Sequence, residues 1–120
     1  MTICITASGA TLESPVNPSF GRAPYFLFVD PDTLEVTPVE NTPGAHGAGV
    51  QAAQTVANKG ASVVITGNVG PNAHQGLSAA GIEIYVGAKG TAKQALDDYR
   101  AGRLACTDTP TSAGHGGGKR

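Results

Sequence analysis

Two glycine pairs with the same internal spacing each follow a short apolar run and precede a segment typical of a helix. The first loop is Gly67-Asn-Val-Gly70 and the second is Gly87-Ala-Lys-Gly90. If the runs before them form parallel neighbouring strands, both loops lie at one edge of a sheet, where open α/β sheets bind ligands. Each loop then opens a helix N-terminus, whose free N–H groups and partial positive charge favour an anion. The alternative is that the glycines merely make tight strand-to-helix turns.

Neither loop carries a signature of nucleotide binding. The Gly-Lys-Ser/Thr of a P-loop is missing at the required spacing, and so is the Gly-x-Gly-x-x-Gly of a dinucleotide fingerprint.

Three side chains are candidate partners of an anion at these loops. Arg22 is the only Lys or Arg before Lys59, and it lies in Phe20-Gly-Arg-Ala-Pro-Tyr-Phe26. His46 lies in a glycine-rich loop just before a predicted helix, and Lys89 lies inside the second glycine pair. The alternatives are a surface arginine, a histidine that ligates a metal or helps to start a helix, and a solvated loop lysine.

Metal ligands with a recognised spacing are missing from the sequence. Cys4 and Cys106 lie about 100 residues apart, with no Cys-x-x-Cys, and we expect both to be reduced thiols. His74 is expected to be exposed and without a role, and His115 lies in a glycine-rich tail where metal binding would be adventitious. A metal species bound here would therefore bring its own ligands, such as sulfides, and be held as an anion.

Catalytic patterns are also missing, so we expect no enzymatic activity and no catalytic residue. Two-metal hydrolysis needs converging carboxylates, whereas Asp30 and Asp32 fall in a hairpin turn at the wrong end of the sheet. A Cys–His nucleophile pair stays open, although Cys4 is predicted to be buried. The sequence has no Gly-x-Ser-x-Gly elbow.

Composition narrows the class of protein further. The chain has 120 residues, which fits one domain, with 14% charged residues and a net charge of −1. It lacks the clustered Lys and Arg that nucleic-acid binding requires. No apolar run is long enough for a membrane span, and no signal peptide is recognised, so we expect a cytoplasmic protein without a membrane or nucleic-acid partner.

Periodicity predicts an α/β domain with a single five-stranded mixed sheet and helices on both faces. Pro38 favours an edge position for the third strand, in which Leu34 and Val36 are expected to point inward. The predicted order is β-β-β-α-β-α-β-α, with a domain at 1–104 and a flexible His/Gly-containing tail at 105–120. The expected strands are 2–8, 25–30, 34–39, 61–66 and 82–86, and the helices end at Gly60, Gly81 and Gly102, the last one starting with a capping box at Thr91.

Several motifs in this order resemble the dinitrogenase iron–molybdenum cofactor biosynthesis family of small cluster-binding proteins. They are Phe20-Gly-Arg-Ala-Pro-Tyr-Phe26, Asn41 with His46-Gly-Ala-Gly49, Gly67-Asn-Val-Gly-Pro-Asn-Ala73, and Gly87-Ala-Lys-Gly-Thr91 with Ala95-Leu96, Tyr99 and Gly102-Arg-Leu104. The resemblance covers residues 1 to about 104. It implies a ribonuclease H-like fold without nuclease activity, and binding, storage or transfer of a metal–sulfur cluster.

Within that family, the length, low charge and His/Gly tail are similar to those of a small carrier of a mixed molybdenum–copper sulfide cluster. The implied cargo is a thiomolybdate–copper–thiomolybdate trianion held without covalent attachment, and an iron–molybdenum precursor is the second candidate. We expect a monomer that exchanges its cargo with a donor or acceptor protein. A protein-interaction module and a phosphate- or nucleotide-binding regulator, both without metal cargo, stay open as alternatives.

The family does not fix which residues hold the cluster, so the expected site comes from the loops and charges described above. No side chain is expected to ligate the metal directly. The expected binding residues are Ser8, Gly9, Phe20, Arg22, His46, Gly47, Gly67, Asn68, Val69, Gly70, Lys89 and Gly90.

Overall fold

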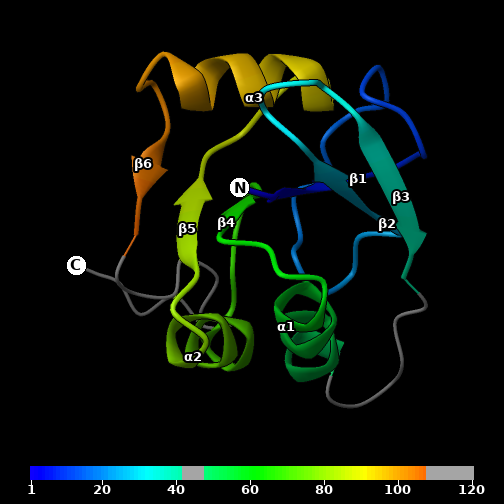
Figure 1. The fold of residues 1–120 in the computed structure, drawn as a ribbon. Helices are drawn as coiled ribbons and strands as arrows, with labels where there is room; N and C mark the ends of the chain where they lie inside the picture. The colour runs from blue at the N-terminus through cyan, green and yellow to red at the C-terminus, as the bar shows by residue number, and fades with distance from the viewer. Residues whose placement is uncertain (42–47, 108–120) are drawn as a thin grey trace.

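The chain folds around one mixed sheet with helices on both faces, in a computed structural model that describes residues 1–41 and 48–107 (Figure 1). Helix α3 covers one face, and α1 and α2 cover the other. The elements are β1 (Ile3–Ala7), β2 (Tyr25–Val29), β3 (Val36–Glu40), α1 (Ala48–Asn58), β4 (Val63–Ile65), α2 (Pro71–Ala79), β5 (Glu83–Val86), α3 (Ala92–Arg100) and β6 (Ala105–Cys106).

The sheet has six strands in the order β3-β2-β1-β4-β5-β6, so the prediction of five strands was wrong. The additional strand is β6, which pairs antiparallel with β5. Its two residues are exposed, so no alternation of apolar and polar residues marks it in the sequence. The strand exists because it pairs with β5. The ribonuclease H-like topology implied by the resemblance stays a prediction.

Strand directions bring the predicted loops together. Strands β1, β4 and β5 are parallel neighbours, and β3 has the same direction through two antiparallel pairings. All four strands therefore end at one edge of the sheet, which we call the carboxyl edge. There the Gly87 N–H donates to the Gly67 carbonyl over 3.0 Å, and the Ala88 N–H donates to the Thr66 carbonyl over 3.2 Å. The prediction that both glycine loops share one edge is confirmed.

The central strands β1 and β2 are buried on both faces. One face packs Cys4 and Phe26 against α1 and α2, and the other packs Ile5 and Leu27 against α3. Helices α1 and α2 approach so closely that a Cβ added at Gly76 would lie 2.8 Å from the Ala53 Cβ.

Strand β3 lies at the edge of the sheet, as Pro38 predicted. The Asn41 N–H donates to Pro24 and the Asp30 N–H donates to Glu35. Because bonded pairs alternate along an antiparallel ladder, the pair Leu27–Pro38 lies between bonded pairs. The nitrogen of Pro38 therefore faces outward, where its missing N–H breaks no bond within the sheet.

The expectation for Leu34 was wrong. Leu34 lies in the turn before β3 with φ +63°, and its side chain is 40% exposed instead of pointing inward. Asp30 organises this turn, since its Oδ1 accepts from the Asp32 and Thr33 N–H groups and its carbonyl accepts from the Leu34 N–H over 2.7 Å. Hydrogen bonds of the turn therefore outweigh the apolar character of the side chain.

Candidate functional site

The topology places most of the predicted binding residues at the carboxyl edge. Ser8 and Gly9 follow β1, Arg22 precedes β2, Gly67 to Gly70 follow β4, and Lys89 and Gly90 follow β5. His46 and Gly47 lie outside the described residues, so their assignment stays a prediction.

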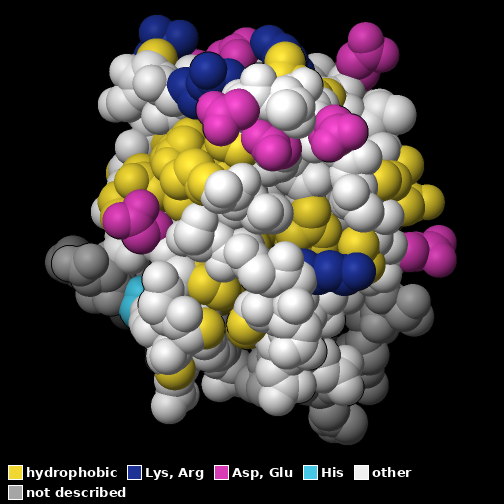
Figure 2. Space-filling model, viewed as in Figure 1, with side chains coloured by type: hydrophobic (Ala, Val, Ile, Leu, Met, Phe, Trp, Pro, Cys, Tyr) yellow, Lys and Arg dark blue, Asp and Glu magenta, His cyan; other side chains and the backbone are white. Residues whose placement is uncertain are grey.

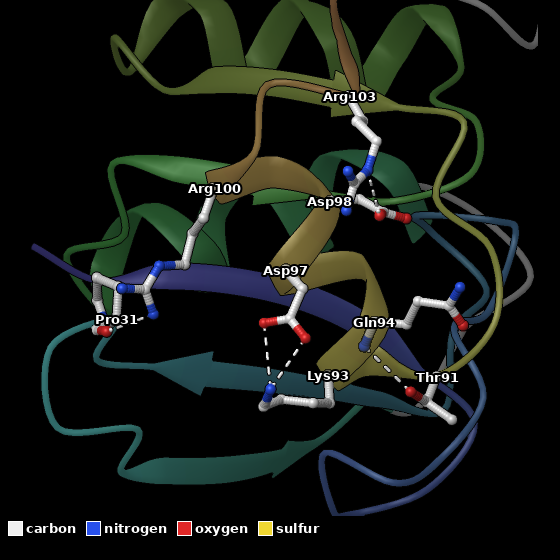
Figure 3. A network of polar contacts seen from close by, with 8 residues as sticks. All are labelled: Pro31, Thr91, Lys93, Gln94, Asp97, Asp98, Arg100 and Arg103. Carbon is white, nitrogen blue, oxygen red and sulfur yellow. Dashed lines mark hydrogen bonds and ion pairs between the residues drawn. The ribbon is translucent and has the colours of Figure 1, made fainter.

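The N-terminus of α3 is already occupied by the chain itself. The Ala92 N–H donates to the Ser14 carbonyl over 2.9 Å, and the Lys93 N–H donates to the Leu12 carbonyl over 2.8 Å. The Gln94 N–H donates to the Thr91 Oγ1 over 3.1 Å, which confirms the predicted cap (Figure 3). The expectation that the second glycine loop opens a free helix end was therefore wrong.

The glycines of the second loop have structural roles. Gly90 has φ +75°, and a Cβ there would overlap the side chain of Gln94. Its carbonyl accepts from the Val16 N–H over 2.8 Å. The long loop after β1 therefore fastens this turn, and the assignment of Gly90 to the binding site stays a prediction.

The N-terminus of α2 is different. Gly70 is the N-cap and has no side chain to accept a hydrogen bond, and Pro71 has no N–H to offer. The Asn72 and Ala73 N–H groups have no hydrogen-bond acceptor within residues 1–41 and 48–107. The first turn also carries no acidic side chain. This end of α2 therefore has the donors and the partial positive charge that an anion needs.

Helix α1 strengthens the positive field at the same place. It begins at Ala48 after β3, so both α1 and α2 start at the carboxyl edge and run parallel to each other. Neither helix contains an Asp, Glu, Lys or Arg. Figure 2 shows most charged side chains in the upper part of the face it presents, where Figure 1 places α3. The dipoles of α1 and α2 are thus not offset by their own carboxylates.

The segment that precedes β2 is fastened to the loop after β4. The Asn68 N–H donates to the Pro18 carbonyl over 2.7 Å, and the Phe20 N–H donates to the Asn68 carbonyl over 3.2 Å. A Cβ at Gly67 would lie 2.8 Å from the Pro18 Cα. The close approach of Pro18 therefore explains why position 67 is glycine, without a ligand.

Two of the predicted binding residues, Phe20 and Val69, have side chains that belong to the core. Phe20 is 1% exposed and stacks on Phe26, with ring centroids 5.5 Å apart, and Val69 is fully buried. Both side chains pack in the cluster that α1 and α2 cover. Their burial anchors the loop before α2 to the core.

The two predicted cations are available at the rim. Arg22 and Lys89 are exposed, and neither side chain forms an ion pair or hydrogen bond with any other described residue. The backbone around Arg22 is fixed by Asn41, whose Nδ2 donates to the Gly21 carbonyl over 3.3 Å and to the Ala23 carbonyl over 2.7 Å. In the sequence, Asn41 stands out only as part of a family motif. No local pattern predicts that its side chain donates hydrogen bonds to a segment about 20 residues earlier.

Two further polar features were missed. The Thr6 and Thr66 hydroxyls are buried and lie 2.9 Å apart where β1 and β4 end, and Thr6 also contacts the Asn17 carbonyl over 2.8 Å. His74, expected to be exposed, is half-buried, and its Nε2 is shielded from solvent without a hydrogen-bond partner among the described residues. For the pair of buried hydroxyls, the only signal in the sequence was Thr66, which follows an apolar strand.

Protein ligands for a bare metal ion do not gather in the described part of the chain, where no group of three or more His, Cys, Asp or Glu residues could hold one. Cys4 is buried, and burial raises the pKa of its thiol, so it stays protonated. Cys106 is exposed on the edge strand β6. Asp30 and Asp32 lie at the edge opposite the glycine loops, as predicted.

None of the described helices is long and apolar enough to cross a membrane.

Known proteins share both the sequence pattern and the fold. The chain is 40% identical to the orange protein from Desulfovibrio gigas, solved in its apo form, with a TM-score of 0.88 over 92% of this chain and 95% of that one. It is 39% identical to a Thermotoga protein that carries the name NifB and belongs to the DUF35 family, with a TM-score of 0.82 over 92% and 96% of the two chains.

A curated relative matches over a shorter stretch. The uncharacterized protein MJ0580 of Methanocaldococcus jannaschii is 35% identical over 75 residues, and the match spans 58% of this chain and 64% of the relative. The model of the family described as "Dinitrogenase iron-molybdenum cofactor" matches residues 1–102. The chain therefore belongs to the dinitrogenase iron–molybdenum cofactor family.

Proposed function

We propose that the chain is a non-enzymatic carrier that binds an anionic metal–sulfur cluster at the N-terminus of α2 and releases it to an acceptor protein. The observation that carries this proposal is the contrast between two helix ends at one edge. The N–H groups of α3 donate to Ser14, Leu12 and Thr91, whereas those of Asn72 and Ala73 in α2 have no acceptor among the described residues.

The chemistry of the edge favours a cluster that brings its own ligands. Cys4 is a protonated, buried thiol, and the described side chains contain no set of metal ligands. Backbone amides and the exposed Arg22 and Lys89 instead recognise negative charge. Hydrogen bonds to charged groups contribute about 1.5–3 kcal/mol each, so a few of them hold a multiply charged anion reversibly, as a carrier requires.

The cargo that we propose is a thiomolybdate–copper–thiomolybdate trianion. This choice is supported by the family and by the 40% identity to the orange protein. An iron–molybdenum precursor is the alternative cargo of the same chemical class. Ser8, Gly9, Gly70 and Lys89 would line the rim, and we include in the proposed site His46 and Gly47, which lie outside the described residues. We place the carrier in the cytoplasm, as a monomer.

A phosphate- or nucleotide-binding regulator is the second candidate, because the same helix end of α2 also suits a phosphate group. The sequence offers this group no P-loop lysine and no dinucleotide fingerprint. A protein-interaction module without cargo would leave the donors of α2 unused.

The first experiment is purification without chelators, followed by a visible spectrum and by molybdenum, copper and sulfide analysis. The apoprotein is then titrated with tetrathiomolybdate and copper(I), with inorganic phosphate as competitor. We expect a coloured complex that contains both metals with inorganic sulfide and survives gel filtration. A protein that stays colourless under both conditions, or that binds phosphate and releases thiomolybdate, contradicts the proposed function.

A further inference from the structure

Asn41 is the residue at which the chain leaves β3, and its side chain reaches the segment that precedes β2. Its Nδ2 donates to the carbonyls of Gly21 and Ala23, over 3.3 Å and 2.7 Å. Its backbone N–H donates to the Pro24 carbonyl over 2.8 Å. A primary amide has two N–H donors on one nitrogen, and here both are used on the two carbonyls that flank Arg22.

Arg22 itself has no comparable anchor. Its side chain is exposed and forms no ion pair or hydrogen bond within residues 1–41 and 48–107. On the N-terminal side, the nearest fixed point is Phe20, whose N–H donates to the Asn68 carbonyl over 3.2 Å. Between Phe20 and Pro24, the Asn41 carboxamide is therefore the one side chain of the described residues that holds the backbone by hydrogen bonds.

This geometry matters for binding because a loose segment must be ordered when its arginine contacts an anion. That ordering costs conformational entropy, and a segment that is already fixed avoids the cost. Asn68 joins the same segment to the loop that opens α2. The two asparagines therefore hold the backbone on both sides of Arg22 at a fixed place relative to the start of α2.

We propose that Asn41 is a positioning residue, whose carboxamide fixes the backbone on both sides of Arg22 so that the guanidinium meets an anion bound at the α2 N-terminus. The inference rests on the proposed function for the anion. The hydrogen bonds of Asn41 themselves are present in the protein without cargo.

A double-mutant cycle tests the coupling. The variants Asn41→Ala, Arg22→Ala and the double variant are titrated with tetrathiomolybdate and copper(I). We expect Asn41→Ala to weaken binding by about fivefold, as the loss of two hydrogen bonds implies. In the Arg22→Ala background, the same change is expected to alter affinity by less than about twofold. Equal losses with and without Arg22 would show a general structural role and overturn the proposal.

A second measurement needs no cargo. Trypsin cleaves after arginine, so its rate at Arg22 reports how far the segment departs from its fixed conformation. We expect Asn41→Ala to be cut there about fivefold faster than the wild type, and Asn41→Ser, which retains one donor, to be intermediate and to serve if the alanine variant does not fold. The matched control is Asn58→Ala, an exposed asparagine at the end of α1.

The outcomes separate the two proposals. Equal tryptic rates at Arg22 in wild type and in the folded Asn41 variants would refute the clamp, whatever the cargo. Faster cleavage in a protein whose wild type binds neither tetrathiomolybdate nor copper(I) would support the clamp and refute the proposed function. Faster cleavage together with coupled binding losses would support both.

Discussion

Replacing Arg22 with alanine removes one of the two exposed cations, Arg22 and Lys89, that have no partner among the described residues at the carboxyl edge. Because the side chain is exposed, the dielectric constant of water applies, and a unit charge about 5 Å away contributes about 0.8 kcal/mol. A trianion triples this value to roughly 2.5 kcal/mol, and physiological salt screens it by about half. The expected loss is therefore about 1.3 kcal/mol, or about tenfold in affinity.

The assay is a titration of apoprotein with tetrathiomolybdate and copper(I), followed by visible absorption at low and high salt. Arg103→Ala is the matched control, because Arg103 is also exposed and pairs with Asp98 beside α3 over 3.1 Å (Figure 3). It removes the same charge from a different place. Arg22→Ala should bind about tenfold more weakly, with a smaller salt dependence, and Arg103→Ala should bind like the wild type. Equal affinities of the two variants would show that the charge of Arg22 does not contact the anion.

Three further predictions concern stability. Gly67→Ala should lower the free energy of unfolding by about 2 kcal/mol in urea denaturation, because its Cβ would lie 2.8 Å from the Pro18 Cα; an unchanged midpoint would contradict the close approach. Thr91→Ala should cost about 1 kcal/mol through the lost Gln94 N–H bond, without weakening cargo binding in the titration. Burial raises the pKa of the Cys4 thiol, so the folded state keeps a proton that the unfolded chain loses above about pH 8.5. The unfolding free energy should therefore fall by about 1.5 kcal/mol between pH 8.5 and pH 10, and Cys4→Val should flatten that slope.

The elements that depend on local pattern were predictable. The β-branched runs before Gly67 and Gly87 formed parallel strands, and the Thr91 cap started α3 as expected. Leu34 departed from its pattern because Asp30 closes a turn through its own side chain and carbonyl. Strand β6 could not be predicted, because two exposed residues become a strand only by pairing with β5.

The edge at which the glycine loops meet was predictable from the sequence, whereas the hydrogen bonding of the helix N–H groups at that edge was not. Strand order alone brought the glycine loops to one edge. The acceptors that close α3 are Ser14 and Leu12, about 80 residues earlier in the chain, and no local pattern indicates such a contact. The clamp of Asn41 on the backbone around Arg22 is equally non-local. Long-range hydrogen bonds therefore close the start of α3, whereas the Asn72 and Ala73 N–H groups of α2 have no acceptor among the described residues.

The proposed function requires that the anion binds at the start of α2 and not at the start of α3. Amide chemical shifts of the ¹⁵N-labelled protein, compared before and after loading with tetrathiomolybdate and copper(I), test it directly. We predict that the Asn72 and Ala73 amides move most, while Ala92 and Lys93, which already donate to carbonyls, stay in place. Large shifts at Ala92 and Lys93, or shifts confined to the surroundings of Cys106, would contradict the account.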